Sequence, residues 1–383
     1  MKILMLLRSP LDNDSRVKKE IQSLTKFAHE ISIISVNTKS ANLKNHYVHK
    51  WDAKRRVLPG ISLILSFFSF FIFSFNRYKD HRIIHSHDLN TLTTAVLIKF
   101  LHFKKNIDII YDTHEFAINC VPDESLIKRA HKYIIELLFI RFCKEVICVG
   151  GLIGQRYSQL YNIKPPSIIL NCPPLNDSFN ACDNKLLKKN FFREKFKIKP
   201  SQKIFLYQGL LNKGRCIEMW LDVFKNFNEN DPVIIFMGYG KLEGVIKKHQ
   251  AKGSNIFYQN TVPPEVILDY SSSADIGVCC LEGDSTESKR LALPNKLFEY
   301  MMARLPVIVS NGPEMVSVIK GHKAGFILAK NTTADAIKLI KEIQNIDLTV
   351  FNKNLSKASL LFNWENQSIV LKELYNNIDK QVE

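Results

Sequence analysis

The sequence predicts an α/β protein built from two parallel-sheet domains in tandem. Two series of short apolar runs, each separated by helical patterns, support this fold class, and the proline-containing stretch Asn171–Asp183 lies between them. At 383 residues the chain is long enough for about two ordinary domains. Hydrophobic residues make up 46% and charged residues 23% of it, which is typical of folded globular proteins.

The first domain is expected over residues 1–172. A charged amphipathic helix at Ser15–Phe27 separates the first two predicted strands, and this succession predicts parallel pairing. Asp14 or Ser15 is the expected cap of that helix. The predicted strands of this domain are Ile3–Leu7, Ile31–Val36, Ile83–His85, Ile109–Tyr111 and Val146–Val149.

The second domain is expected over residues 173–362, followed by a helical segment at 363–383 that includes Trp364–Ile378. Apolar runs between helical patterns again predict a parallel sheet. The predicted strands of this domain are Ile204–Tyr207, Val233–Met237, Ile256–Tyr258, Ile276–Cys280 and Val307–Val309.

The run Ile61–Phe75 stands apart, because it is rich in phenylalanine and carries no charge. It is shorter than the roughly 20 apolar residues that a membrane-spanning helix needs. Cations flank it at 54–56 and at 77–79, which favours a helix lying in the interface of an anionic membrane. The alternative is a hydrophobic helix packed on the sheet. One helical face carries its serines, Ser62, Ser66 and Ser69.

The net charge of +16 favours anionic partners such as phosphorylated substrates or acidic lipids. No arginine-rich tail, zinc-finger spacing or RNA-binding signature accompanies it, so we expect no nucleic-acid partner. The eight cysteines form no CxxC pair, and several lie in apolar runs. This pattern predicts reduced cysteines, no structural zinc site and a cytoplasmic protein. The short apolar N-terminus suits a buried strand better than a signal peptide.

The segment Leu293–Asn311 carries the clearest functional signal. A short polar loop at 294–296 is expected to run into a helix that carries Glu299 one turn in. A cation such as Lys296 and a helix N-terminus both favour phosphate, and the carboxylate can accept two ribose hydroxyls. The segment therefore predicts a nucleoside diphosphate site; the alternative is an amphipathic helix with solvated charges.

Other polar clusters also follow predicted strands, where ligands bind in open parallel sheets. In the first domain these clusters are His85–Leu89 and Tyr111–Glu115, for which a structural and a ligand-binding role both stay open. In the second domain they are Tyr207–Gly209, Lys213–Arg215 and Met237–Gly240, which combine glycine turns with cations.

In order and spacing, these segments and Asp14–Glu20 resemble the glycosyltransferase family 4 group of GT-B enzymes, above all the bacterial transferases that build capsular or lipopolysaccharide sugars. The resemblance spans nearly the whole chain. It implies two Rossmann-like domains facing across a cleft, with a C-terminal helix crossing back to the N-terminal domain. It also implies a UDP- or GDP-sugar donor and retention of configuration at the anomeric carbon.

The resemblance also implies roles for single residues. His114 would contact the donor sugar, Arg215 would neutralise the leaving diphosphate with Lys213 as an alternate, and Glu299 would bind ribose. Asn260–Pro263 and Ser273–Asp275 would border the base. The further donor-binding residues that it implies are Gly209, Gly238, Gly240, Thr261, Asn295 and Lys296.

The chain departs from the family pattern at several positions. Arg8–Asp14 replaces a glycine-rich loop, and Cys216 and Arg304 stand where relatives have glycine. Leu291 occupies the position of the first of two paired glutamates. The acidic residues that could substitute for it are Glu282, Asp284 and Glu287.

We therefore expect a retaining hexosyl- or N-acetylhexosaminyl-transferase that acts on a lipid-linked or growing glycan in cell-surface polysaccharide synthesis, attached peripherally to the inner membrane face. No cofactor is expected. Although Asp12–Asp14 has the spacing of metal-dependent transferases, it lies on the acceptor side, so no metal is expected either. The alternatives are a nucleotide-sugar epimerase of the same fold and an inactive membrane-associated assembly subunit. A dehydrogenase is disfavoured, because no GxGxxG follows the first strand.

Overall fold

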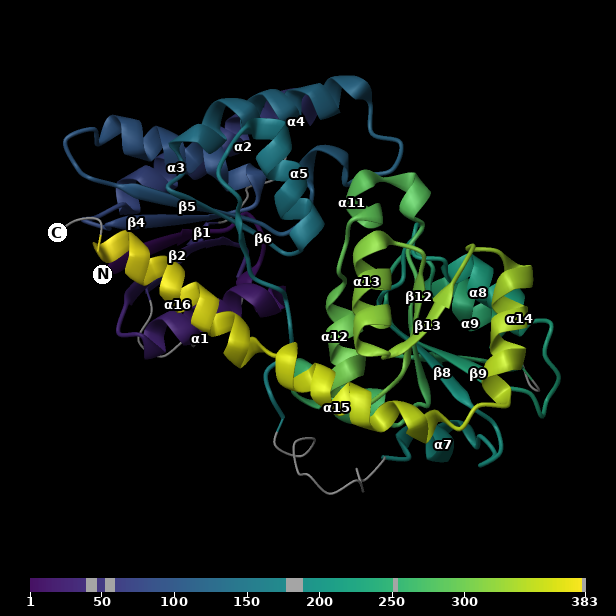
Figure 1. Cartoon of the computed structure of the whole chain (residues 1–383). Coiled ribbons are helices and arrows are strands. Elements are labelled where there is room, and N and C mark those ends of the chain that lie inside the picture. Colours follow the sequence, from purple (N-terminus) through teal and green to yellow (C-terminus); the bar gives the residue numbers. More distant parts are fainter. Residues whose placement is uncertain (39–46, 52–58, 177–188, 251–253, 381–383) are drawn as a thin grey trace. The chain divides into compact units, whose positions relative to one another are not determined.

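The structure is a computed structural model that describes residues 1–38, 47–51, 59–176, 189–250 and 254–380. The chain forms two compact units, which we call unit 1 and unit 2 (Figure 1). Unit 1 comprises Met1–Cys120, Glu124–Ile169 and Gln367–Glu383, and unit 2 comprises Val121–Asp123 and Leu170–Asn366.

Unit 1 is built on a seven-stranded sheet in the order β3-β2-β1-β4-β5-β6-β7, in which all neighbours are parallel. The five strands predicted for this domain are confirmed. The two strands that were not predicted, β3 and β7, have weak sequence signals. The residues of β3 are partly polar, and β7 is only two residues long. The strands are β1 (Lys2–Leu6), β2 (Glu30–Val36), β3 (Tyr47–Trp51), β4 (Ile83–His87), β5 (Asp108–Thr113), β6 (Glu145–Cys148) and β7 (Ser167–Ile168).

Helices cover both faces of this sheet. In Figure 1, α2, α3 and α4 lie on one side, whereas α1 and α16 lie on the other. The helices are α1 (Ser15–Lys26), α2 (Pro59–Arg77), α3 (Leu89–Leu101), α4 (Leu126–Phe139), α5 (Gly151–Tyr161) and α16 (Trp364–Lys380), with 3-10 turns η1 (Leu11–Asn13), η2 (Ala117–Asn119) and η3 (Ile140–Phe142).

Two local expectations for unit 1 are confirmed. The Asp14 carboxylate accepts a hydrogen bond of 3.0 Å from the backbone N–H of Val17, so Asp14 caps α1. The C-terminal helix α16 packs on the N-terminal unit, where the hydroxyl of Tyr375 lies 2.8 Å from Nδ1 of the buried His85. The cations at 54–56, which supported the prediction of a membrane-interface helix, lie outside the described residues.

Unit 2 is built on a six-stranded parallel sheet in the order β10-β9-β8-β11-β12-β13. Successive strand residues point to opposite faces, so Leu206 and Ile235 join one apolar cluster while Phe205 and Phe236 join the other. The five predicted strands are confirmed. The strands are β8 (Ile204–Leu210), β9 (Val233–Tyr239), β10 (Ile256–Gln259), β11 (Ile276–Cys279), β12 (Val307–Ser310) and the unpredicted β13 (Gly325–Leu328).

Short helices connect these strands. They are α7 (Phe191–Phe196), α8 (Ile217–Phe224), α9 (Glu243–His249), α10 (Ile267–Ser272), α11 (Glu287–Arg290), α12 (Asn295–Met302), α13 (Pro313–His322), α14 (Thr333–Gln344) and α15 (Asn352–Leu361), with 3-10 turns η4 (Pro264–Val266), η5 (Gly283–Ser285) and η6 (Leu348–Phe351).

Candidate active site

In unit 2 the strand order reverses between β8 and β11, because the chain builds outward from each of these strands to opposite edges. Open parallel sheets bind ligands at the carboxyl ends of the strands beside such a reversal. The segments that follow β8 and β11 meet there, since the backbone N–H of Glu282 donates to the carbonyl of Gly214 at 3.2 Å. Topology therefore places a candidate site at this edge.

Glycines keep the backbone of this edge bare. Gly209 and Gly238 are opposite one another in the β8–β9 register, and a Cβ on Gly238 would lie 1.8 Å from the carbonyl oxygen of Gly209. Gly209 has φ +111°, a conformation that favours glycine. Gly240, with φ +153°, forms the turn after β9. Close packing of neighbouring backbone therefore requires glycine at 238 and 240.

Lys296 brings a buried ammonium group to this edge. Lys296 is 7% exposed, and its Nζ lies 3.5 Å from the ring centroid of Tyr207 and has no hydrogen-bond partner within residues 1–38, 47–51, 59–176, 189–250 and 254–380. The predicted polar loop at 294–296 is corrected, because α12 already begins at Asn295, directly after Pro294. Lys296 thus lies in the first helical turn, which holds no acidic residue, and a cation at that helix end favours an anionic ligand.

Two further cations flank the turn after β8. Arg215 is partly exposed and forms no hydrogen bond or ion pair with a described residue. Lys289 was not predicted, and its Nζ lies 1.8 Å from where a Cβ on Gly214 would be. Burial and the nearby Arg215 lower the pKa of Lys289, against the opposing effect of Glu282. Nothing in the local sequence marks Lys289, because only the fold brings α11 to this turn.

Glu299 is held by a hydrogen-bond chain. Nε2 of Gln208 donates to its Oε2 at 2.6 Å, and Oγ of Ser271 donates to Oε1 of Gln208 at 2.7 Å. The backbone N–H of Gln208 in turn donates to the hydroxyl of Tyr300 at 2.8 Å. The sequence patterns marked both Glu299 and the segment that contains Gln208, but not their contact, because the two residues are 91 positions apart in the chain.

The other predicted donor-binding residues are more peripheral. Lys213, Thr261 and Asn295 are exposed, and Thr261 follows β10, two strands away from β8. Asp275 corrects an expectation, because it precedes β11 and therefore lies at the amino edge of the sheet, away from the glycine turns. There its carboxylate accepts a hydrogen bond of 2.9 Å from Arg193.

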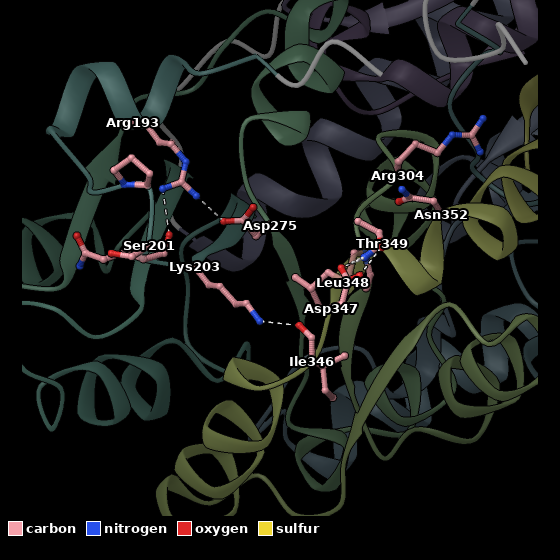
Figure 2. A pocket seen from close by; sticks show the side chains of 13 residues that line it. Arg193, Ser201, Lys203, Asp275, Arg304, Ile346, Asp347, Leu348, Thr349 and Asn352 are labelled. Atoms are coloured by element: carbon pink, nitrogen blue, oxygen red, sulfur yellow. Dashed lines mark hydrogen bonds and ion pairs between the residues drawn. The ribbon is translucent and has the colours of Figure 1, made fainter. Parts of the chain in front are cut away.

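A separate cavity of about 300 Å³ lies at that amino edge (Figure 2). Figure 2 shows Arg193 directed at Asp275 and Lys203 directed at the carbonyl of Ile346. Lys203 also donates to Ile343 and Gln344, so it caps the end of α14. Arg193 and Lys203 therefore already form hydrogen bonds with acceptors of the protein, in contrast to the cations at the carboxyl edge.

Both residues that replace a glycine of the family pattern have left-handed backbones. Cys216, at the start of α8, has φ 57°, and Arg304, after α12, has φ 62°. Left-handed backbone is where glycine is favoured, so the resemblance located these turns correctly from sequence. Arg304 donates a hydrogen bond of 2.8 Å to Ser359, and Cys216 is buried.

Unit 1 carries a second, buried polar cluster. Arg16 from α1 donates to both carboxylate oxygens of Asp112 at 2.9 and 3.1 Å, and its Nε lies 3.0 Å from Glu20. His85 and His87 stack beside this pair, with ring centroids 4.3 Å apart. Burial lowers the pKa of His85 to about 4, and burial and His85 lower that of His87, so both imidazoles are neutral. The family resemblance included the segment Asp14–Glu20 but gave Arg16 and Glu20 no role.

His114 lies at the partly exposed border of this cluster, with a 22% exposed side chain. Its Nδ1 is 3.6 Å from Asp88 and its Nε2 is 3.7 Å from Asp112. Burial lowers the pKa of His114, but Asp88 and Asp112 outweigh burial and raise it to about 10. The carboxylate of Asp88 is itself 45% exposed, so water screens part of its effect. At neutral pH His114 is therefore a cation and a hydrogen-bond donor, not a base.

Comparisons with known proteins support the fold. Residues 188–358 match the family model described as Glycosyl transferases group 1. The chain is similar to sucrose-phosphate synthase from Thermosynechococcus elongatus, with 13% identity, 100% of each chain covered and a TM-score of 0.74.

Two further solved structures are similar. HepE from Anabaena, in complex with UDP and glucose, has 12% identity and a TM-score of 0.73, covering 98% of this chain and 100% of that one. WaaG, a glycosyltransferase involved in lipopolysaccharide biosynthesis, has 11% identity and a TM-score of 0.68, covering 97% and 98%. No curated protein matches this sequence.

Proposed function

We propose, on the premise that residues 188–358 are a glycosyl transferases group 1 domain within a GT-B fold, that this protein transfers a sugar from a nucleotide-sugar donor to a lipid-linked or growing glycan acceptor. The observation that carries the proposal is the group of cations at the carboxyl edge of unit 2, where Arg215, Lys289 and Lys296 lack a carboxylate partner among the described residues.

The cations would bind the diphosphate of the donor. Charge on the diphosphate grows as the bond to the sugar breaks, so fixed cations stabilise the transition state more than the ground state. Lys296 and the N-terminus of α12 would act on one side, with Arg215 and Lys289 at the turn after β8. The alternate, Lys213, is more exposed and would contribute less.

The carboxylate of Glu299 would accept hydrogen bonds from the two ribose hydroxyls. The hydrogen bond from Gln208 orients its carboxylate. Of the acidic residues that could replace the missing glutamate, Glu282 is the one whose backbone joins the Gly214 turn, so we assign the sugar contact to it. In unit 1, His114 stays the predicted contact to the donor sugar, and its positive charge suits hydrogen-bond donation to a sugar oxygen.

We also propose that α2 lies on an anionic membrane surface. The face of α2 that carries the fully buried Phe70 and Ser74 is turned toward the protein. Beside it, Ser66 accepts a hydrogen bond from Arg8 at 2.8 Å, and the exposed Ser69 accepts one from Trp51 at 3.2 Å. The opposite face is apolar and 50–60% exposed at Ile64, Leu65, Phe68 and Ile72. This exposure favours the membrane interpretation over a helix packed on the sheet.

The exposed apolar surface continues beyond α2. Phe100, Leu101 and Phe103, at the end of the neighbouring α3, are 50–77% exposed, and Lys104 and Lys105 follow them. Apolar side chains beside lysines suit anionic lipid head groups. Among the described residues, no helix is both long and apolar enough to cross a membrane.

The enzyme activity is tested with a panel of UDP- and GDP-sugars, with and without a polyprenyl-linked acceptor extract, by measuring nucleoside diphosphate release. We expect release with one donor that depends on acceptor, and NMR of the product should show the anomeric configuration of the donor. Release of free sugar or of a new nucleotide sugar without acceptor would instead indicate an epimerase. No release, and no thermal shift with UDP or GDP, would indicate an inactive subunit.

The assigned residues are tested by single substitutions. Arg215→Ala and Glu299→Ala should abolish turnover while circular dichroism and the unfolding midpoint stay those of the parent protein. Near-normal turnover in either variant would contradict its assignment.

The membrane surface is tested by cosedimentation with vesicles that contain phosphatidylglycerol or only phosphatidylcholine. We expect binding to the anionic vesicles, and loss of binding in the double variant Phe68→Ser, Ile72→Ser. The matched control is Leu360→Ser, Leu361→Ser, which changes two equally exposed apolar residues of unit 2 and should bind like the parent. Equal binding of both variants would contradict the proposal.

A further inference from the structure

We propose that unit 1 binds one divalent cation of the zinc class through Glu20, His85, His87 and Asp112. These side chains come from three elements that the fold brings to one place. His85 and His87 are two residues apart on β4 and therefore share a face, and Asp112 is opposite His87 in the β4–β5 register. Glu20 reaches them from α1. One potential ligand atom of each lies within 4.8 Å of all the others.

The side chains carry buried polar atoms that the protein does not satisfy. Glu20 and His85 are fully buried and His87 is 2% exposed. Nε2 of both histidines and both carboxylate oxygens of Glu20 form no hydrogen bond with a described residue, although Oε1 of Glu20 lies 3.0 Å from Nε of Arg16 as an ion pair. Buried polar atoms are almost always hydrogen-bonded in proteins, so a group of them directed at one another points to a ligand.

Arg16 accounts for only part of the local charge. Its guanidinium hydrogen-bonds both oxygens of Asp112 and also donates to the carbonyl of Ile169 at 2.8 Å. Its Nε lies 2.9 Å from Asp112 and 3.0 Å from Glu20, so one guanidinium, with a single positive charge, is shared by two buried carboxylates. A divalent cation beside Glu20 would supply the remaining positive charge, because unpaired buried carboxylates are costly.

The distances between the potential ligand atoms are somewhat longer than those around a bound zinc ion. Nε2 of His87 lies 3.9 Å from Oε2 of Glu20, and Nε2 of His85 lies 3.9 Å from Oδ2 of Asp112. Tetrahedral zinc, with bonds of about 2.0–2.1 Å, separates its ligands by about 3.4 Å. These pairs would therefore move together by about 0.5 Å on binding, and ligand atoms as far apart as 4.8 Å by up to about 1.4 Å.

A contact with Tyr375 orients His85 in the way that is usual for a metal-binding histidine. A ligating histidine usually donates its other ring N–H to a fixed acceptor. Nδ1 of His85 lies 2.8 Å from the hydroxyl of Tyr375 on α16, which leaves Nε2 directed at the cluster. Two imidazoles and two carboxylates suit zinc and related transition ions better than calcium or magnesium. The ion would be structural, because the site is buried, and it would tie α1 to β4 and β5.

The test uses the full-length protein, stripped with a chelator and titrated with Zn²⁺ against a chromophoric competitor. We expect one tightly bound equivalent, a rise in the unfolding midpoint, and an X-ray absorption spectrum with only nitrogen and oxygen ligands. His87→Gln should weaken Zn²⁺ binding by about 100-fold or more. The control His131→Gln changes an exposed histidine on α4 and should leave the affinity unchanged.

Absence of a tight equivalent in the wild-type protein with Zn²⁺, Co²⁺ and Mn²⁺ would overturn the proposal and imply that a proton neutralises Glu20. Sulfur ligands in the spectrum would assign any bound zinc to cysteine and overturn it equally. Because both measurements use the wild-type chain, the decision does not depend on the folding of a variant.

Discussion

The polar clusters of the two units differ in whether their cations are paired with carboxylates. In unit 1, Arg16 lies within 3.0 Å of the carboxylates of Asp112 and Glu20, and His114 lies between two carboxylates. In unit 2, Lys296 is also buried, but its ammonium group has no hydrogen-bond partner in the part of the chain that the structure describes. Among the described residues, the ammonium group of Lys289 donates a hydrogen bond only to the hydroxyl of Ser285, at 3.0 Å.

This difference separates charges that hold the fold from charges available to a ligand. A paired buried cation stabilises its carboxylates and becomes costly to remove, whereas an unpaired one is costly to keep. Substituting cations in the two units should therefore have opposite consequences for stability and for binding.

The largest expected effect is on the stability of unit 1. Arg16→Met leaves two buried carboxylates without their cation, and we expect a loss of about 3–5 kcal/mol in the free energy of unfolding. Urea denaturation followed by circular dichroism measures it. The matched variant in unit 2, Lys296→Met, should change the free energy by less than about 1 kcal/mol, since it breaks no ion pair. Equal losses in the two variants would remove the distinction between the units.

The next effect concerns ligand binding. Lys296→Met should weaken the binding of the nucleoside diphosphate that the parent protein prefers by about 10–100-fold, the usual value of a hydrogen bond to a charged group. Isothermal titration calorimetry measures it. Lys213→Met is the control, because Lys213 is exposed at the same turn and should have a much smaller effect. If Lys213→Met were the more damaging change, the diphosphate assignment would pass to that residue.

The third expected effect is a change in the pKa of His114. The pKa of His114 is raised from 6.5 to about 10 in the folded protein, so its charge contributes stability fully below pH 6.5 and loses that contribution as the pH rises toward 10. Asp88→Asn removes one of the two carboxylates and should lower this pKa. NMR titration of the imidazole resonances measures both values. A His114 that titrates near its ordinary value in the parent protein would show that water screens the carboxylates more strongly than the geometry implies.

The smallest effect concerns the glycine turn of unit 2. Gly214→Ala adds a methyl group where Lys289 lies and strains a backbone with φ +81°, so we expect a loss of about 1 kcal/mol in stability together with weaker diphosphate binding. Gly244→Ala is the control, because a Cβ there meets no atom within 4 Å and alanine favours the helix α9. Thermal unfolding and calorimetry compare the two. Unchanged binding in Gly214→Ala would remove Lys289 from the site.

The sequence alone determined the two parallel sheets, the helix α2 and the C-terminal helix, because periodicity and apolar runs are local signals. It also marked Lys296 and Glu299 through the spacing of one segment, and the family pattern predicted glycine at the left-handed positions of Cys216 and Arg304. The strands β3 and β13 escaped prediction, since a short strand gains its stability from its neighbours rather than from its own residues.

Only the tertiary structure decided which charges are paired. Arg16 meets Asp112 across 96 residues of chain, and Lys289 reaches Gly214 through the reversal of strand order at β8 and β11. Such contacts depend on how the elements pack, and no local pattern encodes a partner that distant in sequence. The chain thus specifies its two sheets locally, while the fold fixes which cations hold it together and which remain for an anionic ligand.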